Sequence, residues 1–449
     1  MEIALLTAYA LLVAASAWTP GKRTAAAFYV NGRQSGALGL GLSIIVSCVG
    51  ASATIGMVGM AFHAGTPAFW WLGSGAAGLL LLSFFLAGAV RKSGAYTLPH
   101  LTESCLGPAA RPLVSALVVI AWSAILAAQF TALGSLIAGL TGLPAAACLA
   151  LSFFLICAHS LGGQAAVMRV DRVQAAIIFL ALFILLAWLC RRNPAWPDLA
   201  ALEAVNADFT ASDLVYYLLV IGANYVVCPM LFGRLLSAKN ERSARLGGLI
   251  GALGIVLAAA LIVAVGLACR GLVPPGTPAD EVLSALLAVE TPRWLRLAAS
   301  LALISAVVSS ADSCLITAAT VLSFDLLRRP APSAGRACVL ALGIGGALIS
   351  LWGKGILGFL LMAYDIFACG VVMPVLVGLL QRRRRPDPRW SVAAVGLGGL
   401  LGLMAALSGV RLWSCAGMGI SFGLAAIGAI ISGARESAVG HECSPSLNE

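Results

Sequence analysis

Apolar stretches of about 20 residues recur along the whole chain, and no extended polar region separates them. Each is long enough to cross the hydrocarbon core of a bilayer as a helix. Only 10% of the residues are charged, whereas a soluble domain carries about 25%. The sequence therefore predicts an all-α membrane protein, with residues 1–449 forming one transmembrane domain.

We predict thirteen spans from these stretches. They lie near residues 3–18, 38–62, 68–90, 112–139, 143–159, 167–190, 213–233, 247–269, 297–325, 337–353, 356–380, 390–409 and 414–433. The first has no basic residue before it and no clear cleavage signature after it. We therefore expect a retained helix rather than a signal peptide.

The basic residues predict the orientation of the chain. An odd number of spans puts the two termini on opposite sides of the membrane. If the N-terminus lies outside, all but seven of the 28 Lys and Arg residues fall in cytoplasmic segments, as the positive-inside rule requires. We therefore expect a multi-pass protein of the cell (plasma or inner) membrane, with the N-terminus outside and the C-terminus in the cytoplasm. The seven exceptions are Arg191, Arg192, Arg270, Arg293, Arg296, Lys354 and Arg411.

The same distribution argues against other functions. The net charge of +10 arises from short clusters between apolar spans, so we expect contact with membrane lipid and none with nucleic acid. The twelve cysteines are scattered without a CxxC motif, and no two of the four histidines lie close together. We find no DDxxD or HExxH motif. An enzyme and a clustered metal site are therefore not expected.

Two spans have interiors that do not suit a plain lipid-facing helix. The second contains Gly50, Ala51 and Ala53 among serine and threonine, and the seventh contains Gly222, Asn224 and Pro229 close together. Small residues could simply allow tight helix packing. However, the two spans are five apart, and an odd repeat length inverts the second copy. Inverted repeats that open with a broken helix are typical of transporters, with substrate and ion sites near the midplane.

The ninth span carries the most informative cluster, with Ser309, Ser310, Asp312 and Ser313 close together inside a membrane helix. Burying such groups without partners would cost several kcal/mol. Hard cations prefer oxygen ligands, which hydroxyls and a carbonyl one turn earlier could supply to sodium. The alternative is that the serines bond to the preceding turn while Asp312 faces a water-filled vestibule.

At this point the chain resembles the solute:sodium symporter family, which includes sodium/proline, sodium/glucose and sodium/pantothenate transporters. The resemblance rests on the order and spacing of several motifs over nearly the whole chain. They are Phe28 to Gly32 with Arg33; Leu161 to Ala165 with Asp171 and Gln174; Pro229 with Arg234, Ala238-Lys239 and Ala244-Arg245; Ala306 to Ser313; and Ala363-Tyr364 with Pro374.

The resemblance implies a LeuT-like fold of two inverted five-helix repeats, with one helix before them and two after. The repeats would cover 37–190 and 213–380, and the additional helices 389–433. The family's main sodium site would take carbonyl oxygens of Val46, Val49 and Ala306 and the hydroxyls of Ser309 and Ser310.

The resemblance also implies a role for acidic residues beyond the main site. Asp171 matches an aspartate near the ion's cytoplasmic exit. Some relatives hold a second sodium between that aspartate and groups that correspond to Asp312 and Ser313. The sodium/proline branch has an aspartate where this chain has Cys48, so proline is a doubtful substrate.

We expect the solute to bind between the two broken helices and their neighbours. The candidate contacts are Gly50, Ala51, Ala53, Gln129, Asn224, Tyr225 and Cys228. Gln129 could instead only tie helices together, and Tyr225 could be a packing ring. Asp365 lies mid-span, and an ionisable group at that depth is a functional candidate. It could face a cationic solute or a proton path, or pair with backbone or a lysine.

The sequence thus predicts a sodium-coupled symporter that imports a small organic solute by alternating access. The alternative is a proton-coupled or sodium-independent carrier of the same fold. The partners are the solute, the sodium ion and lipid, while the identity of the solute, the number of sodium ions and the oligomeric state stay open.

The orientation is testable by cysteine labelling of a variant without native cysteines. We expect an impermeant thiol reagent to label Glu2→Cys in intact cells, and Gly440→Cys only after permeabilisation, because of the charge asymmetry. Labelling of both positions from the same side would contradict the thirteen-span prediction.

Overall fold

A computed structural model describes residues 7–11, 15, 24–192, 202–289, 291–380 and 387–442. The first predicted span, 3–18, lies mostly outside these residues. Within the described ranges, ten helices are long and apolar enough to cross a membrane, and a bent pair forms an eleventh candidate. The protein is therefore a multi-pass membrane protein.

The candidate spans follow the sequence closely. They are α3 (Ala37–Cys48) with η2 (Ser52–Gly56) and α4 (Met57–Ala64); η3 (Thr66–Phe69), α5 (Trp70–Leu81), η4 (Leu82–Leu86) and α6 (Ala87–Lys92); α8 (Arg111–Thr141); α10 (Gln164–Arg192); α11 (Ala211–Tyr217), η6 (Leu218–Gly222), α12 (Ala223–Val226) and α13 (Pro229–Leu236); α14 (Glu241–Ala268); α16 (Arg293–Val321) with η8 (Leu322–Leu326); α17 (Pro332–Ser350); α18 (Gly355–Phe367), η9 (Ala368–Val372) and α19 (Met373–Leu380); α20 (Pro388–Ser408); and α21 (Arg411–Glu442).

One further apolar helix, α9 (Ala145–Ser160), corresponds to the predicted span 143–159 but is shorter than the others. Short helices α2 (Ala25–Val30), α7 (Leu98–Leu106) and α15 (Val282–Val289) connect the spans, together with the turns η1 (Asn31–Arg33) and η7 (Ala279–Glu281). Twelve of the thirteen predicted spans thus have a matching helix. The full count and the inverted-repeat arrangement stay predictions.

Local sequence signals explain where several helices begin and end. Thr210 and Asp213 form a reciprocal capping box at the start of α11, and the side chain of Asn240 caps α14. Such caps satisfy amide groups that the first turn leaves without partners. Gly142 and Gly409 end α8 and α20 in the left-handed conformation, which glycine adopts without steric cost.

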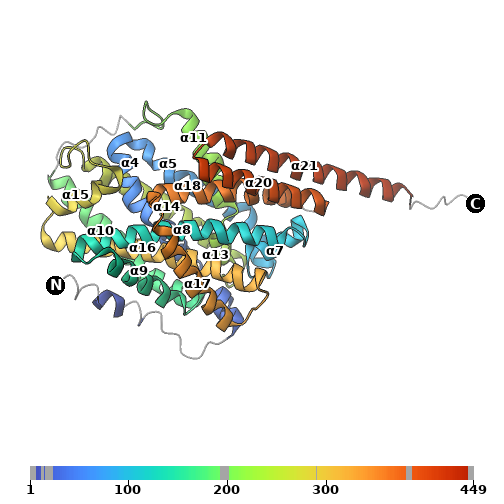
Figure 1. The fold of residues 1–449 in the computed structure, drawn as a ribbon, viewed down its shortest axis with the longest axis horizontal. Coiled ribbons are helices and arrows are strands. Elements are labelled where there is room, and N and C mark those ends of the chain that lie inside the picture. The colour runs from blue at the N-terminus through green and yellow to red at the C-terminus, as the bar shows by residue number, and fades with distance from the viewer. Residues whose placement is uncertain are drawn as a thin grey trace, which may run out of the picture.

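The α16 helix lies at the centre of the bundle, with 89% of its most apolar window buried. It packs against α3, α8, α9 and α10, and Figure 1 shows it among α8, α9 and α10. Because it is surrounded by protein, its serines and Asp312 meet other side chains and backbone rather than lipid. The α20 and α21 helices pack side by side at the edge of the bundle, against η9 and, through α20, α18 (Figure 1).

The two helices predicted to be broken differ in shape. The second span bends by 64° between Cys48 and Ser52. The seventh is interrupted at Val227 and Cys228, where the backbone leaves the helical region before Pro229 begins α13. It nevertheless continues in one direction as a single span. The interruption was therefore correctly predicted in both spans, but of the two only the second span is sharply bent.

Close helix packing also depends on small residues, as at Gly78 on α5. A Cβ atom at this position would overlap the carbonyl oxygen of Gly222 in η6. Backbone cannot move aside as easily as a side chain, so glycine is required at this contact between α5 and the seventh span.

We expect Gly78→Ala to lower the free energy of unfolding by about 1–3 kcal/mol, because the added methyl group overpacks the contact. The measurement is thermal unfolding of the purified protein in detergent. Gly134→Ala on α8 is the matched control, because a Cβ there meets no atom within 4 Å and alanine favours the helix. Equal melting temperatures for the two variants would contradict the described packing.

Candidate ion site and solute cavity

The end of α3 and the middle of α16 meet through serine hydroxyls and backbone carbonyls. Ser309 Oγ lies 2.9 Å from the carbonyl oxygen of Val46 and 2.9 Å from that of Ala306. Ser310 Oγ lies 3.3 Å from the Val46 carbonyl oxygen and 3.0 Å from that of Ser47. Four of the five predicted sodium ligands are therefore brought together.

Val49, the fifth predicted ligand, is the C-cap residue directly after α3, with φ −91° and ψ 67°. The last carbonyls of a helix lack amide partners further along the chain. Since the chain turns away after Cys48, the carbonyls of Val46 and Ser47 accept hydrogen bonds from α16 instead. The result is a buried set of oxygen atoms, which is the ligand type that hard cations prefer.

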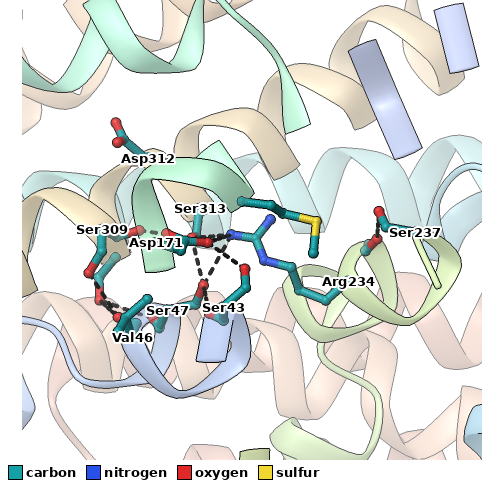
Figure 2. Close-up of polar contacts among 12 residues, drawn as sticks. Ser43, Val46, Ser47, Asp171, Arg234, Ser237, Ser309, Asp312 and Ser313 are labelled. Atoms are coloured by element: carbon teal, nitrogen blue, oxygen red, sulfur yellow. Dashed lines mark hydrogen bonds and ion pairs between the residues drawn. The ribbon is translucent and has the colours of Figure 1, made fainter. Parts of the chain in front are cut away.

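Figure 2 shows a second polar cluster beside these oxygens, into which the guanidinium of Arg234 points. Arg234 comes from α13 and is fully buried. Its Nη2 lies 2.5 Å from Ser313 Oγ, 3.1 Å from Ser47 Oγ and 3.3 Å from Asp171 Oδ2. Ser43 also donates to the Asp171 carboxylate. Asp171 therefore forms an ion pair with an arginine that is distant in sequence.

Asp171 has two arginines beside it in the sequence, Arg169 and Arg172. An ion pair with either of them at the membrane interface would be the simplest arrangement. Asp171 is instead fully buried on α10, while Arg169 donates to the carbonyl of Ala165 in its own helix. A buried charge needs a partner in place of water, and Arg234 supplies it from more than 60 residues away.

Asp312 and Ser313 are adjacent in sequence but have different partners. Ser313 Oγ lies 2.7 Å from Ser47 Oγ and contacts Arg234. Asp312 points away from that cluster (Figure 2) and toward α9. There it accepts from Ser160 Oγ at 3.2 Å and lies 3.3 Å from Nδ1 of His159. The three residues predicted for a second sodium thus do not share one set of contacts.

A cavity lies next to the serine cluster, between the two interrupted spans. Five of the seven predicted solute contacts line it, namely Gly50, Gln129, Asn224, Tyr225 and Cys228. Ala51 and Ala53 are buried but do not line it. Ser310 lines the cavity as well, so one side chain connects the candidate ion site to the candidate solute site.

Gln129 ties two helical segments together, which was the alternative to solute binding. Its Oε1 accepts the backbone N–H of Ala51 at 3.1 Å. It thereby satisfies an amide group at the bend of the second span while also lining the cavity. The two interpretations of this residue are therefore compatible.

Sequence reasoning missed most of the remaining lining residues. They are Ser47, Cys48, Ser52, Trp71, Trp122, Ile125, Met230, Cys314, Leu360 and Tyr364. Trp71 on α5, Trp122 on α8 and Tyr364 on α18 come from regions that are distant in sequence. An aromatic residue in a membrane helix is ordinary, so only the helix arrangement reveals that these rings face a common space.

Asp365 is not among the residues that line the cavity and is partly buried. Its Oδ1 accepts from Ser414 Oγ at 2.7 Å and from Tyr216 Oη at 3.0 Å. These partners are side-chain hydroxyl groups and not the backbone group or lysine that the sequence suggested as alternatives. Asp365 therefore ties α18 to α11 and α21, and a role with a cationic solute or a proton path stays a hypothesis.

Residues 28–192 match the model of the sodium:solute symporter family. The family resemblance is thereby confirmed over this part of the chain, which contains α3, Gln129 and Asp171. No curated protein sequence matches the chain.

Solved structures extend the likeness to nearly the whole fold. A substrate-bound, outward-open Na⁺-coupled sialic acid symporter has a TM-score of 0.80 at 14% identity, covering 96% of this chain and 97% of its own. A nucleobase-cation-symport-1 family transporter, closed with bromovinylhydantoin bound, has a TM-score of 0.60 at 13% identity and covers 92% and 95%. Its inward-facing conformation has a TM-score of 0.56 at 14% identity and covers 92% and 93%. The chain thus shares the fold of these transporters.

The Asp171–Arg234 pair is testable by a double-mutant cycle. Asp171→Asn leaves the buried guanidinium without a counter-charge, and breaking one side of such a pair costs about 3–5 kcal/mol. We expect a clear fall in the melting temperature of the purified protein. The double variant Asp171→Asn/Arg234→Gln removes both charges and should be more stable than Asp171→Asn alone. Additive losses would show that the two side chains do not interact.

Proposed function

We propose that this protein is a sodium-coupled secondary active symporter that imports a small organic solute by alternating access. The observation that carries the proposal is the joint position of Ser310. It contacts the carbonyls at the broken end of α3 and also lines the cavity. An ion held by these oxygens would therefore act directly on one wall of the solute site.

The proposed sodium ligands are the carbonyl oxygens of Val46, Val49 and Ala306 and the hydroxyls of Ser309 and Ser310. In the described structure the serine hydroxyls donate to the carbonyls of Val46 and Ala306. A sodium ion would accept electron pairs from hydroxyls and carbonyls alike, with the hydroxyl hydrogens turned away. The ion would then hold α16 against α3 with no charged side chain among its ligands.

Coupling follows from this geometry. Sodium binding would order the bend between α3 and η2, where Gly50 lines the cavity and Gln129 accepts the N–H of Ala51. A solute in the cavity would meet a pre-ordered wall and bind more tightly. By linkage, solute binding must strengthen sodium binding by the same factor, typically a coupling of about 1–3 kcal/mol.

The comparisons support this proposal in different ways. The family match covers the α3 half of the ion site, and the fold match includes a Na⁺-coupled symporter. We also propose the two inverted repeats, the N-out, C-in orientation in the cell membrane, and a path for sodium past Asp171 to the cytoplasm. Asp171 would release the ion because Arg234 already balances its charge.

The proposal predicts a sodium-specific defect for Ser310→Ala. Removing the hydroxyl deletes one ligand but leaves the other oxygens in place. We expect the sodium concentration for half-maximal uptake to rise, and apparent solute affinity to fall at low sodium and recover partly at high sodium. Uptake by proteoliposomes under an imposed sodium gradient, screened across labelled solutes, provides the measurement.

Ser115→Ala on α8 is the matched control, because Ser115 is also buried and its hydroxyl donates to the backbone carbonyl of Arg111 in its own helix. It should leave the sodium dependence unchanged. Superimposable sodium curves for wild type and Ser310→Ala would place the ion elsewhere and favour the proton-coupled or sodium-independent alternative, which a pH gradient without sodium would then test.

A further inference from the structure

The short helix α2 and the turn η1 lie directly before the broken second span. Two neighbouring aromatic side chains on α2, Phe28 and Tyr29, are only 3% and 2% exposed. The helix has six residues, whereas an isolated helix needs about 12 residues or more to be even marginally stable in water. Contacts of these two rings with the rest of the protein therefore hold α2 in place.

Tyr29 joins α2 to the end of the helix that carries the candidate ion site. Its hydroxyl donates to the carbonyl of Ala331 at 3.1 Å and lies 3.1 Å from Ser323 Oγ in η8, directly after α16. Its ring packs edge-on against Phe324 of η8, with centroids 6.1 Å apart. In the proposed orientation this is the cytoplasmic end of α16.

Phe28 fills a space that two glycines leave open. A Cβ atom at Gly163, directly before α10, would lie 2.6 Å from the Phe28 ring, and one at Gly335 in α17 would lie 2.5 Å from it. The guanidinium carbon of Arg336 lies 5.8 Å from the centroid of the same ring. The two aromatic rings of α2 are thus held between the start of α10, the end of α16 and the start of α17.

The turn after α2 covers the same face of α10 that carries Asp171. Met168 lies three residues before Asp171, so the two side chains share one face of this helix. Ser35 Oγ lies 3.5 Å and Asn31 Nδ2 3.8 Å from Met168 Sδ, and Met168 is 4% exposed. An ion that moves from Asp171 toward this end of α10 therefore meets a closed layer of side chains, with α2 beside it.

The backbone between α2 and α3 is strained. The φ angles of Asn31, Gly32 and Arg33 are 49°, 60° and 57°, and residues other than glycine rarely adopt this left-handed conformation. Such strain persists only where the surroundings impose it, and it is often found in segments that switch. Here the Arg33 guanidinium donates to the carbonyls of Gly94 and Ala95. Movement of α2 would allow the stretch to relax.

From these observations we propose that α2 is a cytoplasmic plug on the ion path. Phe28 and Tyr29 keep the path closed, and the left-handed residues 31–33 are the hinge about which α2 withdraws when sodium is released. The inference rests on the proposed function, because the direction of release follows from sodium-coupled import. It gives a role in transport to residues that neither belong to the candidate ion site nor line the cavity.

The test uses Met168→Cys as a reporter beneath the plug, in the purified full-length protein without native cysteines. Gly335→Ala adds a methyl group against the Phe28 ring and should destabilise the seated plug by overpacking. We expect a water-soluble methanethiosulfonate to label Met168→Cys about tenfold faster when Gly335→Ala is present. In detergent the reagent reaches both faces of the protein, so the result does not depend on orientation.

Gly345→Ala on the same helix is the matched control, because a Cβ atom there meets nothing within 4 Å. It should leave the labelling rate unchanged. Ser152→Cys on α9 reports any general loosening, since Ser152 is fully buried and donates to a carbonyl of its own helix. Its labelling should stay slow in both glycine variants. Tyr29→Phe removes the hydroxyl contacts with η8 and Ala331, and should also speed labelling of Met168→Cys.

Failure of the plug and failure of sodium coupling give different results. Equal labelling of Met168→Cys in Gly335→Ala and Gly345→Ala, or faster labelling of Ser152→Cys as well, would overturn the plug. Sodium chloride in place of potassium chloride should slow labelling of Met168→Cys, because the ion would hold α3 against α16. Faster labelling in Gly335→Ala without any effect of sodium would support the plug and contradict the proposed ion site.

Discussion

The structure depends on how the carbonyls at the broken end of α3 are satisfied. A helix that stops in the middle of a membrane protein leaves backbone acceptors that neither water nor lipid can reach. Here, Ser309 and Ser310 on α16 donate to the carbonyls of Val46 and Ser47. This contact joins the most buried helix to the bend and produces, at the same place, the oxygen atoms suited to a cation.

A second constraint is the balance of charge around this contact. Asp171 and Arg234 are both fully buried, and each removes the electrostatic penalty of the other. Serine hydroxyls from α3 and α16 bridge the pair to the candidate ion site. The protein thus separates two kinds of chemistry. The paired charges of Asp171 and Arg234 do not line the cavity, and among the described residues its lining carries no charged side chain.

Much of the fold could be predicted because lipid imposes a simple rule on sequence. Apolar length alone located twelve spans for which the structure has a matching helix. The positions of Gly50 and Pro229 indicated the interruptions, since glycine and proline act locally on the backbone. The serines of α16 were recognised as ion-site candidates because polar side chains at that depth need partners, wherever those partners lie.

The sequence by itself therefore determined the helices, their interruptions and the polar residues that must face inward. Only the tertiary structure decided which of those residues meet. It paired Asp171 with Arg234 rather than with its neighbours, turned Asp312 toward His159 and placed Trp71, Trp122 and Tyr364 around one cavity. The physical reason is that helix type and burial follow from local composition. Contacts between helices depend instead on bend angles and on close backbone contacts at glycines, which join segments far apart in the chain.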